Sequence, residues 1–184
     1  VNCLHGASFL IRRELLARVA PSIRDCFLYH EDVQLSWLLH LMGYELYCVP
    51  RSLVLHDYEL HMFPRKLQLL ERNRLEMLGF ALEGRSYLRY APVLLATEAL
   101  VLAYSTLKGP AYLKAKLASY GEVWGRRDQI RRKRRLLSEL RVVPDSDFMP
   151  RLRKTYVFGQ LGSIMKKTER RQAWPEPKGA EDAV

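Results

Sequence analysis

Two adjacent carboxylates, Glu31 and Asp32, stand where a short apolar stretch gives way to a helical pattern. Backbone N–H groups in the first turn of a helix lack partners within the helix and attract a nearby negative charge. A carboxylate fixed at such a place can take the proton of an alcohol that is attacking another group. The same placement also suits a plain helix cap. The pair alone therefore leaves two interpretations open, a catalytic base or a cap.

His56 follows an extended stretch and lies 24 residues after Asp32 (56 − 32 = 24). An imidazole can join carboxylate and phosphate oxygens around a divalent metal such as Mn²⁺ or Mg²⁺. A histidine taken by itself more often has a structural role. Whether His56 is structural or binds a metal therefore depends on the pattern of residues around it. For the remaining histidines we expect structural roles: His5, His30, His40 and His61.

Several short motifs around these residues form one ordered series. They are a Gly-Ala segment with Arg-Arg, an aromatic approach to Glu-Asp, a Gly-Tyr, a Val-Pro and a histidine, at residues 6–13, 27–33, 43–44, 49–50 and 54–56. The series resembles the second half of the family-two inverting glycosyltransferases, in particular the rhamnosyltransferase-like and galactofuranosyltransferase-like branch. The resemblance extends over about residues 2 to 80. Its motifs are specific in combination, although each is weak by itself.

The resemblance implies an α/β fold, the C-terminal part of a GT-A nucleotide-diphospho-sugar transferase domain, over residues 1–84. It implies that Asp32 is the catalytic base, that Glu31 helps to set the acceptor geometry, and that His56 helps to hold Mn²⁺ or Mg²⁺. The metal would neutralise charge on the departing nucleoside diphosphate. The implied reaction transfers a sugar, with inversion, from a nucleotide-diphospho-sugar donor to a glycan or lipid-linked acceptor. Cell-surface polysaccharides are the implied products.

Three more side chains are candidates for contact with donor or acceptor. The Arg-Asn-Arg run that contains Arg72 and Arg74 resembles an Arg-Asn signature that follows the histidine in many relatives, and a guanidinium can bind two oxygens of a diphosphate. The alternative is a solvated helix face on which these arginines pair with Glu71 and Glu76. Trp37, close to the carboxylates, could stack on an acceptor sugar or belong to the core.

Two departures from the family's pattern limit the resemblance. Gln34 and Leu38 stand where relatives often carry Asp and Arg, which leaves the identity of the acceptor open. Upstream of Glu31, the chain also lacks the Asp-x-Asp metal motif and the nucleotide-binding strands that precede this pair in the family. We therefore expect this chain to be inactive by itself.

The pattern along the first part of the chain predicts alternating helices and strands. Pro21 is expected to end the first helix and Gly43 to cap the second. Strands are expected on either side of Arg51, near the edge of a sheet. The expected helices cover residues 33–42 and 64–82, and the expected strands cover residues 45–50 and 52–55. Residues 9–19 are expected to begin as the buried end of a strand and to continue as a short amphipathic helix.

Residues 85–172 are expected to form a helical, basic extension. Within it, residues 90–107 carry one charge, that of Glu98, and predict either a buried helix or a helix in a membrane interface. Residues 126–141 hold eight Arg or Lys and two Asp or Glu, a net charge of 8 − 2 = +6. After Trp174, prolines and acidic residues predict a disordered tail over about residues 173–184.

The whole chain of 184 residues carries a formal net charge of +10, which favours a polyanionic partner. We expect an anionic membrane surface, on the cytoplasmic side, bound peripherally by the basic run Arg131, Arg132, Lys133, Arg134 and Arg135. The alternative to an enzyme is a basic module without catalytic activity that binds membrane or RNA. Aromatic residues are not interleaved with the basic run, so nucleic acid is the less favoured partner.

The three cysteines form no Cys-x-x-Cys pair and are odd in number. This spacing disfavours a disulfide framework and a thiolate metal site, and it fits a reducing cytoplasm. We expect all three to be core thiols: Cys3, Cys26 and Cys48.

Overall fold

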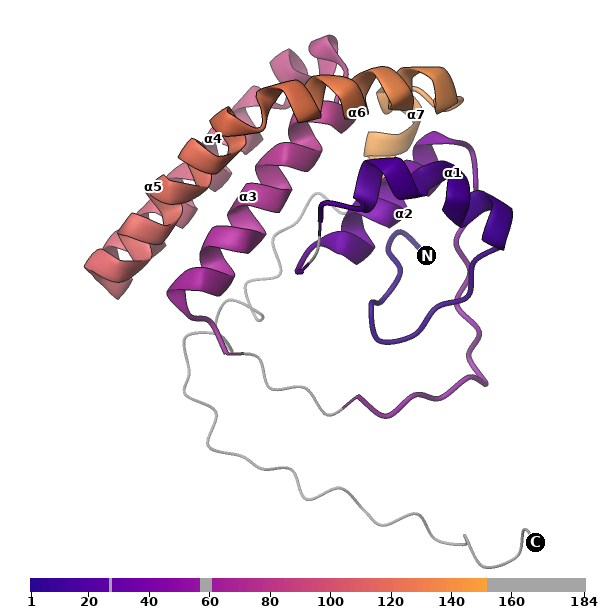
Figure 1. Cartoon of the computed structure of the whole chain (residues 1–184), viewed down its shortest axis with the longest axis horizontal. Coiled ribbons are helices and arrows are strands. Elements are labelled where there is room, and N and C mark those ends of the chain that lie inside the picture. Colours follow the sequence, from indigo (N-terminus) through magenta and orange to yellow (C-terminus); the bar gives the residue numbers. More distant parts are fainter. Residues whose placement is uncertain (27, 57–60, 152–184) are drawn as a thin grey trace, which may run out of the picture. The chain divides into compact units, whose positions relative to one another are not determined.

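The computed structural model describes residues 1–26, 28–56 and 61–151, and within these ranges the regular secondary structure is helical (Figure 1). The expected α/β fold is therefore wrong for this part of the chain, which is all-α. Residues 45–50 and 52–55 form a loop and not two strands. A strand is stabilised by pairing with a neighbour, and the described ranges offer none. The expected disordered tail, residues 173–184, lies outside them.

The central helix is α2 (Glu31–Leu41), which is buried on several sides at once. Its end agrees with the sequence-based prediction, because Gly43 has a φ of +85° directly after the helix. The backbone N–H of Tyr44 then donates to the Leu39 carbonyl at 2.9 Å and closes the last turn. Six of its eleven residues are buried: Gln34, Leu35, Ser36, Leu38, Leu39 and Leu41.

Helix α1 (Arg13–Ile23) packs against α2 and ends four residues later than expected. The buried strand end expected before it is wrong, because Phe9 and Leu10 are exposed and have no regular structure. The prediction that Pro21 ends this helix is wrong, since Pro21 lies inside it. Proline has no backbone N–H, so one intrahelical hydrogen bond is absent at this position. The N–H of Arg24 donates to the Ala20 carbonyl at 2.9 Å and completes the turn.

Four longer helices follow: the first two lie close to where the sequence predicts helices, and the other two fall in the extension that is expected to be helical. Helix α3 (Pro64–Ala81) starts with proline in its first turn, and α4 (Gly84–Lys108) follows after two residues. Gly109, with a φ of +108°, connects α4 to α5 (Pro110–Gly125), and α6 (Arg127–Leu140) continues from there. In Figure 1, α5 lies alongside α3, which also contacts α6, while α4 packs on α5.

The apolar core gathers where α1, α2, α3 and α6 meet. Short helix α7 (Asp145–Phe148), followed by the 3-10 turn η1 (Met149–Arg151), covers one side of it. Its most central members come from all five helices and are almost fully buried: Val19, Leu38, Leu41, Phe80, Leu137 and Phe148. This core fixes α2 and, with it, the position of the two carboxylates at its start.

Candidate functional site

The turn that leads into α2 has an unusual backbone. Tyr29 and His30 both lie in the left-handed region, with φ values of 65° and 72°. For residues other than glycine this conformation costs about 1–3 kcal/mol each and persists only where the surroundings enforce it. Glu31 and Asp32 follow at once as the first residues of the helix. The chain therefore approaches the carboxylate pair through a turn that needs outside support.

Asn73 of α3 supplies that support. Its Nδ2 donates to the carbonyls of Leu28 and Tyr29 at 3.0 and 2.7 Å. Its own Oδ1 accepts from the Nε of Arg72 at 2.9 Å, and its backbone carbonyl accepts from the Nε2 of Gln34 at 3.1 Å. Asn73 and Gln34 are buried. Loss of hydrogen bonds at such buried groups is costly, so this network holds the turn and the first turn of α2 together.

The N-terminal segment lies along α2 and runs in the opposite direction. Two extended residues span about 6.6 Å and one helical turn about 5.4 Å, so each second residue of the segment meets a new turn. The contacts are Asn2 O with His40 Nε2 at 3.2 Å, Leu4 N with Ser36 Oγ at 2.8 Å, and Gly6 N with Asp32 Oδ2 at 3.1 Å. The Gly-Ala segment itself forms a turn, closed by the Ser8 N–H that donates to the His5 carbonyl at 3.2 Å, and this turn reaches the catalytic candidates.

Hydrogen bonds fix the side chain of Asp32, which stays partly exposed to solvent. Its Oδ1 accepts from the backbone N–H of Val33 at 2.8 Å and its Oδ2 from that of Gly6 at 3.1 Å. The residue is partly exposed, and Glu31 beside it is exposed. A Cβ on Gly6 would lie 3.5 Å from Asp32 Oδ2 and 3.6 Å from Glu31 Oε1. Both carboxylates therefore gather at the Gly6 backbone, and we call Gly6, Glu31 and Asp32 the carboxylate site.

His56 is exposed and packs against the ring of His5, edge to face, with ring centroids 5.6 Å apart. His5 precedes Gly6, so His56 borders the segment that carries the carboxylate site. His5 Nδ1 accepts from the N–H of Ala7 at 3.3 Å. In the ranges that the structure describes, no three His, Cys, Asp or Glu side chains are grouped so that they could hold a metal. The metal role of His56 stays a prediction.

The three side chains predicted to contact donor or acceptor are engaged elsewhere. Arg72 is buried and donates to Asn73 and, at 3.2 Å, to Glu122 of α5. Trp37 packs edge to face on Phe148, with centroids 5.1 Å apart. Arg74 pairs with acids of α3 and α4, as described below. In this structure all three join helices to one another, and their contact with a donor or acceptor stays a prediction.

A cluster of ion pairs holds α3, α4 and α5 together. Lys116 is fully buried, and its Nζ lies 2.6 Å from Glu71 Oε2 and 2.8 Å from Glu98 Oε2. Arg74 contacts the same two carboxylates. Burial by itself raises the pKa of Glu98, but hydrogen bonds from Lys116, Tyr120 and Arg74 outweigh it and lower the pKa to about 2. The charges are matched and inward-facing, as expected of a structural cluster.

The basic run of α6 divides into two groups. Lys133 is buried, with its Nζ 2.6 Å from Glu76 Oε1 of α3, so its predicted membrane contact is corrected to an ion pair inside the protein. Arg134 donates to the Gly79 carbonyl at 3.0 Å, although it remains exposed. The other three are exposed, and their membrane contact stays a prediction: Arg131, Arg132 and Arg135.

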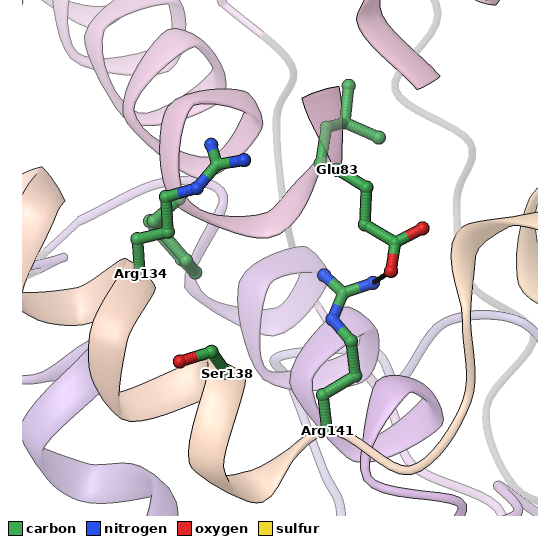
Figure 2. A pocket seen from close by; sticks show the side chains of 6 residues that line it. Glu83, Arg134, Ser138 and Arg141 are labelled. Carbon is green, nitrogen blue, oxygen red and sulfur yellow. Dashed lines mark ion pairs between the residues drawn. The ribbon is translucent and has the colours of Figure 1, made fainter. Parts of the chain in front are cut away.

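A groove lies between the end of α3 and α6 (Figure 2). Glu83 and Arg141 point toward one another there, 3.6 Å apart, while Arg134 and Ser138 come from α6. Arg141 also pairs with Asp145 at 2.8 Å and donates to the carbonyl of Ala81, the last residue of α3. These arginines bind carbonyls that the end of a helix leaves without partners. The groove is therefore a helix cap and not a catalytic cleft.

Of the three cysteines, only Cys26 is a core thiol. Burial, followed by the charges of nearby acids, raises the pKa of Cys26 to about 12, which leaves it an inert thiol. Cys3 and Cys48 are exposed, so the prediction of buried thiols is wrong for both. Their segments form loops over α2 and not strands of a covered sheet.

No family model, curated protein or solved structure matches this chain. The geometry of the carboxylate site is therefore what any function must be argued from. Sequence reasoning named Glu31 and Asp32 but missed Asn73 and Gln34, whose amides hold the turn before them. A signal for Asn73 was present, because it shares a helix face with Met77 and Phe80, and a polar side chain on an apolar face needs a buried partner.

Proposed function

We propose that this chain is part of an inverting glycosyltransferase in which Asp32 accepts the proton of an acceptor hydroxyl. The observation that carries the proposal is the carboxylate site. Asp32 is reachable from solvent and is fixed between two backbone N–H groups at a helix start. The turn before it is strained and is held by a buried amide from another helix. Such strain is concentrated at sites where geometry matters.

The proposed step needs one bond to form and one to break at the same carbon. The acceptor oxygen attacks the anomeric carbon of a nucleotide-diphospho-sugar, its proton passes to Asp32, and the bond to the diphosphate breaks. A carboxylate has about four acceptor positions on its two oxygens. The N–H groups of Gly6 and Val33 use two of them, and others remain for the hydroxyl. The carboxylate of Glu31 also lies beside Gly6 and can bind a second hydroxyl of the acceptor.

The divalent metal that the resemblance implies is given no part in this step, and the metal role of His56 stays a prediction. Mn²⁺ and Mg²⁺ prefer several oxygen ligands, and one described contact of His56 is the imidazole of His5. These two residues do not by themselves fit such an ion. The proposal is therefore argued through the carboxylate site alone.

The test is turnover of nucleotide sugars by the protein encoded by the complete gene, followed as release of nucleoside diphosphate over a panel of donors. Asp32→Asn keeps the shape of the side chain and removes the base. We expect turnover to fall at least about a hundredfold, as loss of a general base implies. The matched control is Asp128→Asn on α6, where the exposed carboxylate pairs with its neighbour Arg131.

The control variant should keep its turnover, and both variants should unfold at the temperature of the wild type. Retained turnover in Asp32→Asn would remove Asp32 from the mechanism. Absence of turnover with every nucleotide sugar tested would reject the transferase itself.

A further inference from the structure

One side of α4 is apolar and turned to solvent. We call it the outer face of α4 and define it by its largest side chains: Leu88, Val93, Leu95, Leu100, Leu102 and Leu107. Leu88, Leu95 and Leu107 are 80%, 69% and 87% exposed. Of the most apolar 18-residue window of this helix, 6% is buried. A core helix is buried against its neighbours, so the structure rules out that alternative for residues 90–107.

The acid of this stretch is turned away from the outer face. Glu98 contacts Arg74 of α3 and Lys116 of α5, and its carboxylate also accepts from Tyr120 at 2.6 Å. These contacts fix the rotation of α4 about its axis. They also hold α4 along its neighbours. By length and composition α4 could cross a membrane, but crossing would break this cluster, so the helix is suited to lie on a surface.

Three hydroxyls of α4 are satisfied within the helix. Thr97 donates to the Val93 carbonyl at 2.8 Å, Ser105 to that of Val101 at 2.7 Å, and Thr106 to Leu102 at 2.9 Å. A hydroxyl that already has a partner costs less to remove from water. These three hydroxyls therefore pose little obstacle to an apolar environment.

Exposed cations stand at both ends of the outer face. Arg85 and Arg89 precede its central leucines, and Lys108 follows them. This order suits a lipid surface, where apolar side chains enter the acyl boundary and long basic side chains reach the headgroups. The net charge of +10 adds attraction to an anionic surface. It opposes a second copy of the chain, which would bring the same charges to the same face.

We propose that the outer face of α4 docks on an anionic lipid bilayer, with α4 lying in the plane of the membrane. The leucines enter the interface, and Arg85, Arg89 and Lys108 contact lipid phosphates. This places the main membrane contact on α4 and not on the basic run of α6. The proposal does not depend on the glycosyltransferase reaction, and its test involves no sugar.

The test is flotation of the whole chain with vesicles of phosphatidylcholine alone and of phosphatidylcholine mixed with phosphatidylglycerol. The variant Leu95→Glu/Leu102→Glu places two charges on one stripe of the outer face. The matched control, Leu53→Glu/Leu55→Glu, makes the same changes at two exposed leucines of the loop before α3. We expect the α4 variant to bind the anionic vesicles at least about tenfold more weakly, and the control to stay within about twofold of wild type.

Circular dichroism and thermal unfolding establish that the variants fold. If the double variant does not fold, the single variant Leu100→Glu replaces it in the flotation test. We again expect weaker binding to the anionic vesicles. The proposal fails if the wild type does not float with anionic vesicles, or if the α4 variant floats as well as the wild type. It also fails if light scattering shows a lipid-free dimer that the α4 variant dissociates while vesicle binding stays unchanged, since a second copy would then cover the face.

Discussion

At the scale of single residues, the amide of Asn73 acts on the carboxylate site without touching it. All of its hydrogen-bonding atoms are used: Nδ2 donates to the carbonyls of Leu28 and Tyr29, and Oδ1 accepts from Arg72. An aspartate has nearly the same shape but cannot donate. Asn73 is a positioning residue, because it fixes the backbone from which Glu31 and Asp32 project.

We predict that Asn73→Asp lowers the free energy of unfolding by about 1–3 kcal/mol, the cost of leaving buried polar groups unpaired. Amide hydrogen exchange of residues 28–33 should become faster, because the left-handed turn loses its support. Residues 128–133 of α6 serve as an internal control and should exchange as in the wild type. Unchanged exchange at residues 28–33 would show that the turn is stable without Asn73.

The sequence indicated the two carboxylates but not the reason for their geometry. A Glu-Asp pair before a helical pattern is a local signal, and it was found. The partner carbonyls of Asn73 lie 44 and 45 residues away in the chain, and no local pattern predicts such a contact. The resemblance to an Arg-Asn signature pointed to Arg72 and Arg74 as ligand contacts. In the structure, both arginines pair with neighbouring acids.

At the scale of helices, α3 and α6 are joined by a buried charge pair. Lys133 and Glu76 are 3% and 2% exposed at their side chains, and Asp25 lies 3.9 Å from the lysine. Removal of both charges from water is costly and is offset only while the pair stays intact. Loss of one partner therefore destabilises the contact, because it leaves the other charge buried and unpaired.

We predict that Lys133→Met lowers the free energy of unfolding by about 3–5 kcal/mol, because Glu76 is left buried without its main partner. Arg132→Met, one residue earlier and exposed, should change it by less than about 0.5 kcal/mol. Urea unfolding of the two variants measures the difference. Equal effects would mean that Lys133 is solvated in solution.

Helices were predicted from sequence more reliably than strands, for a physical reason. The repeat of apolar residues in residues 64–82 is a local property, and α3 forms where it predicts. Residues 45–50 and 52–55 also carry a strand-like composition, but a strand becomes stable only by pairing. Tyr47, Val49 and Leu53 are exposed in the loop that forms instead.

At the scale of the whole described molecule, two kinds of contact share the work of holding it together. An apolar core surrounds α2, whereas α4 and α5 are joined to α3 largely through the ion pairs of Glu98, Glu71, Arg74 and Lys116. Composition predicted a folded, basic chain but not this division. The pairing of Glu98 across three helices needed coordinates.

We predict an acid-sensitive attachment of α4. The pKa of Glu98 is lowered in the folded chain from 4.5 to about 2, so its contribution to stability is present above about pH 4.5 and is lost as the pH falls toward 2. Urea unfolding between neutral and acid pH should show this loss. Glu98→Gln should be less stable at neutral pH and should depend less on pH below 4.5, and an unaltered pH dependence would contradict the prediction.

The left-handed pair at Tyr29 and His30 also restricts which substitutions evolution can accept there. Branched residues such as valine and isoleucine fit that backbone poorly. Glycine fits it without strain, but it also frees the chain to adopt many other conformations. Glycine at either position would relieve the backbone strain, but it would make the turn before Glu31 and Asp32 more flexible. Tyr29 and His30 therefore keep the turn stiff at the cost of backbone strain.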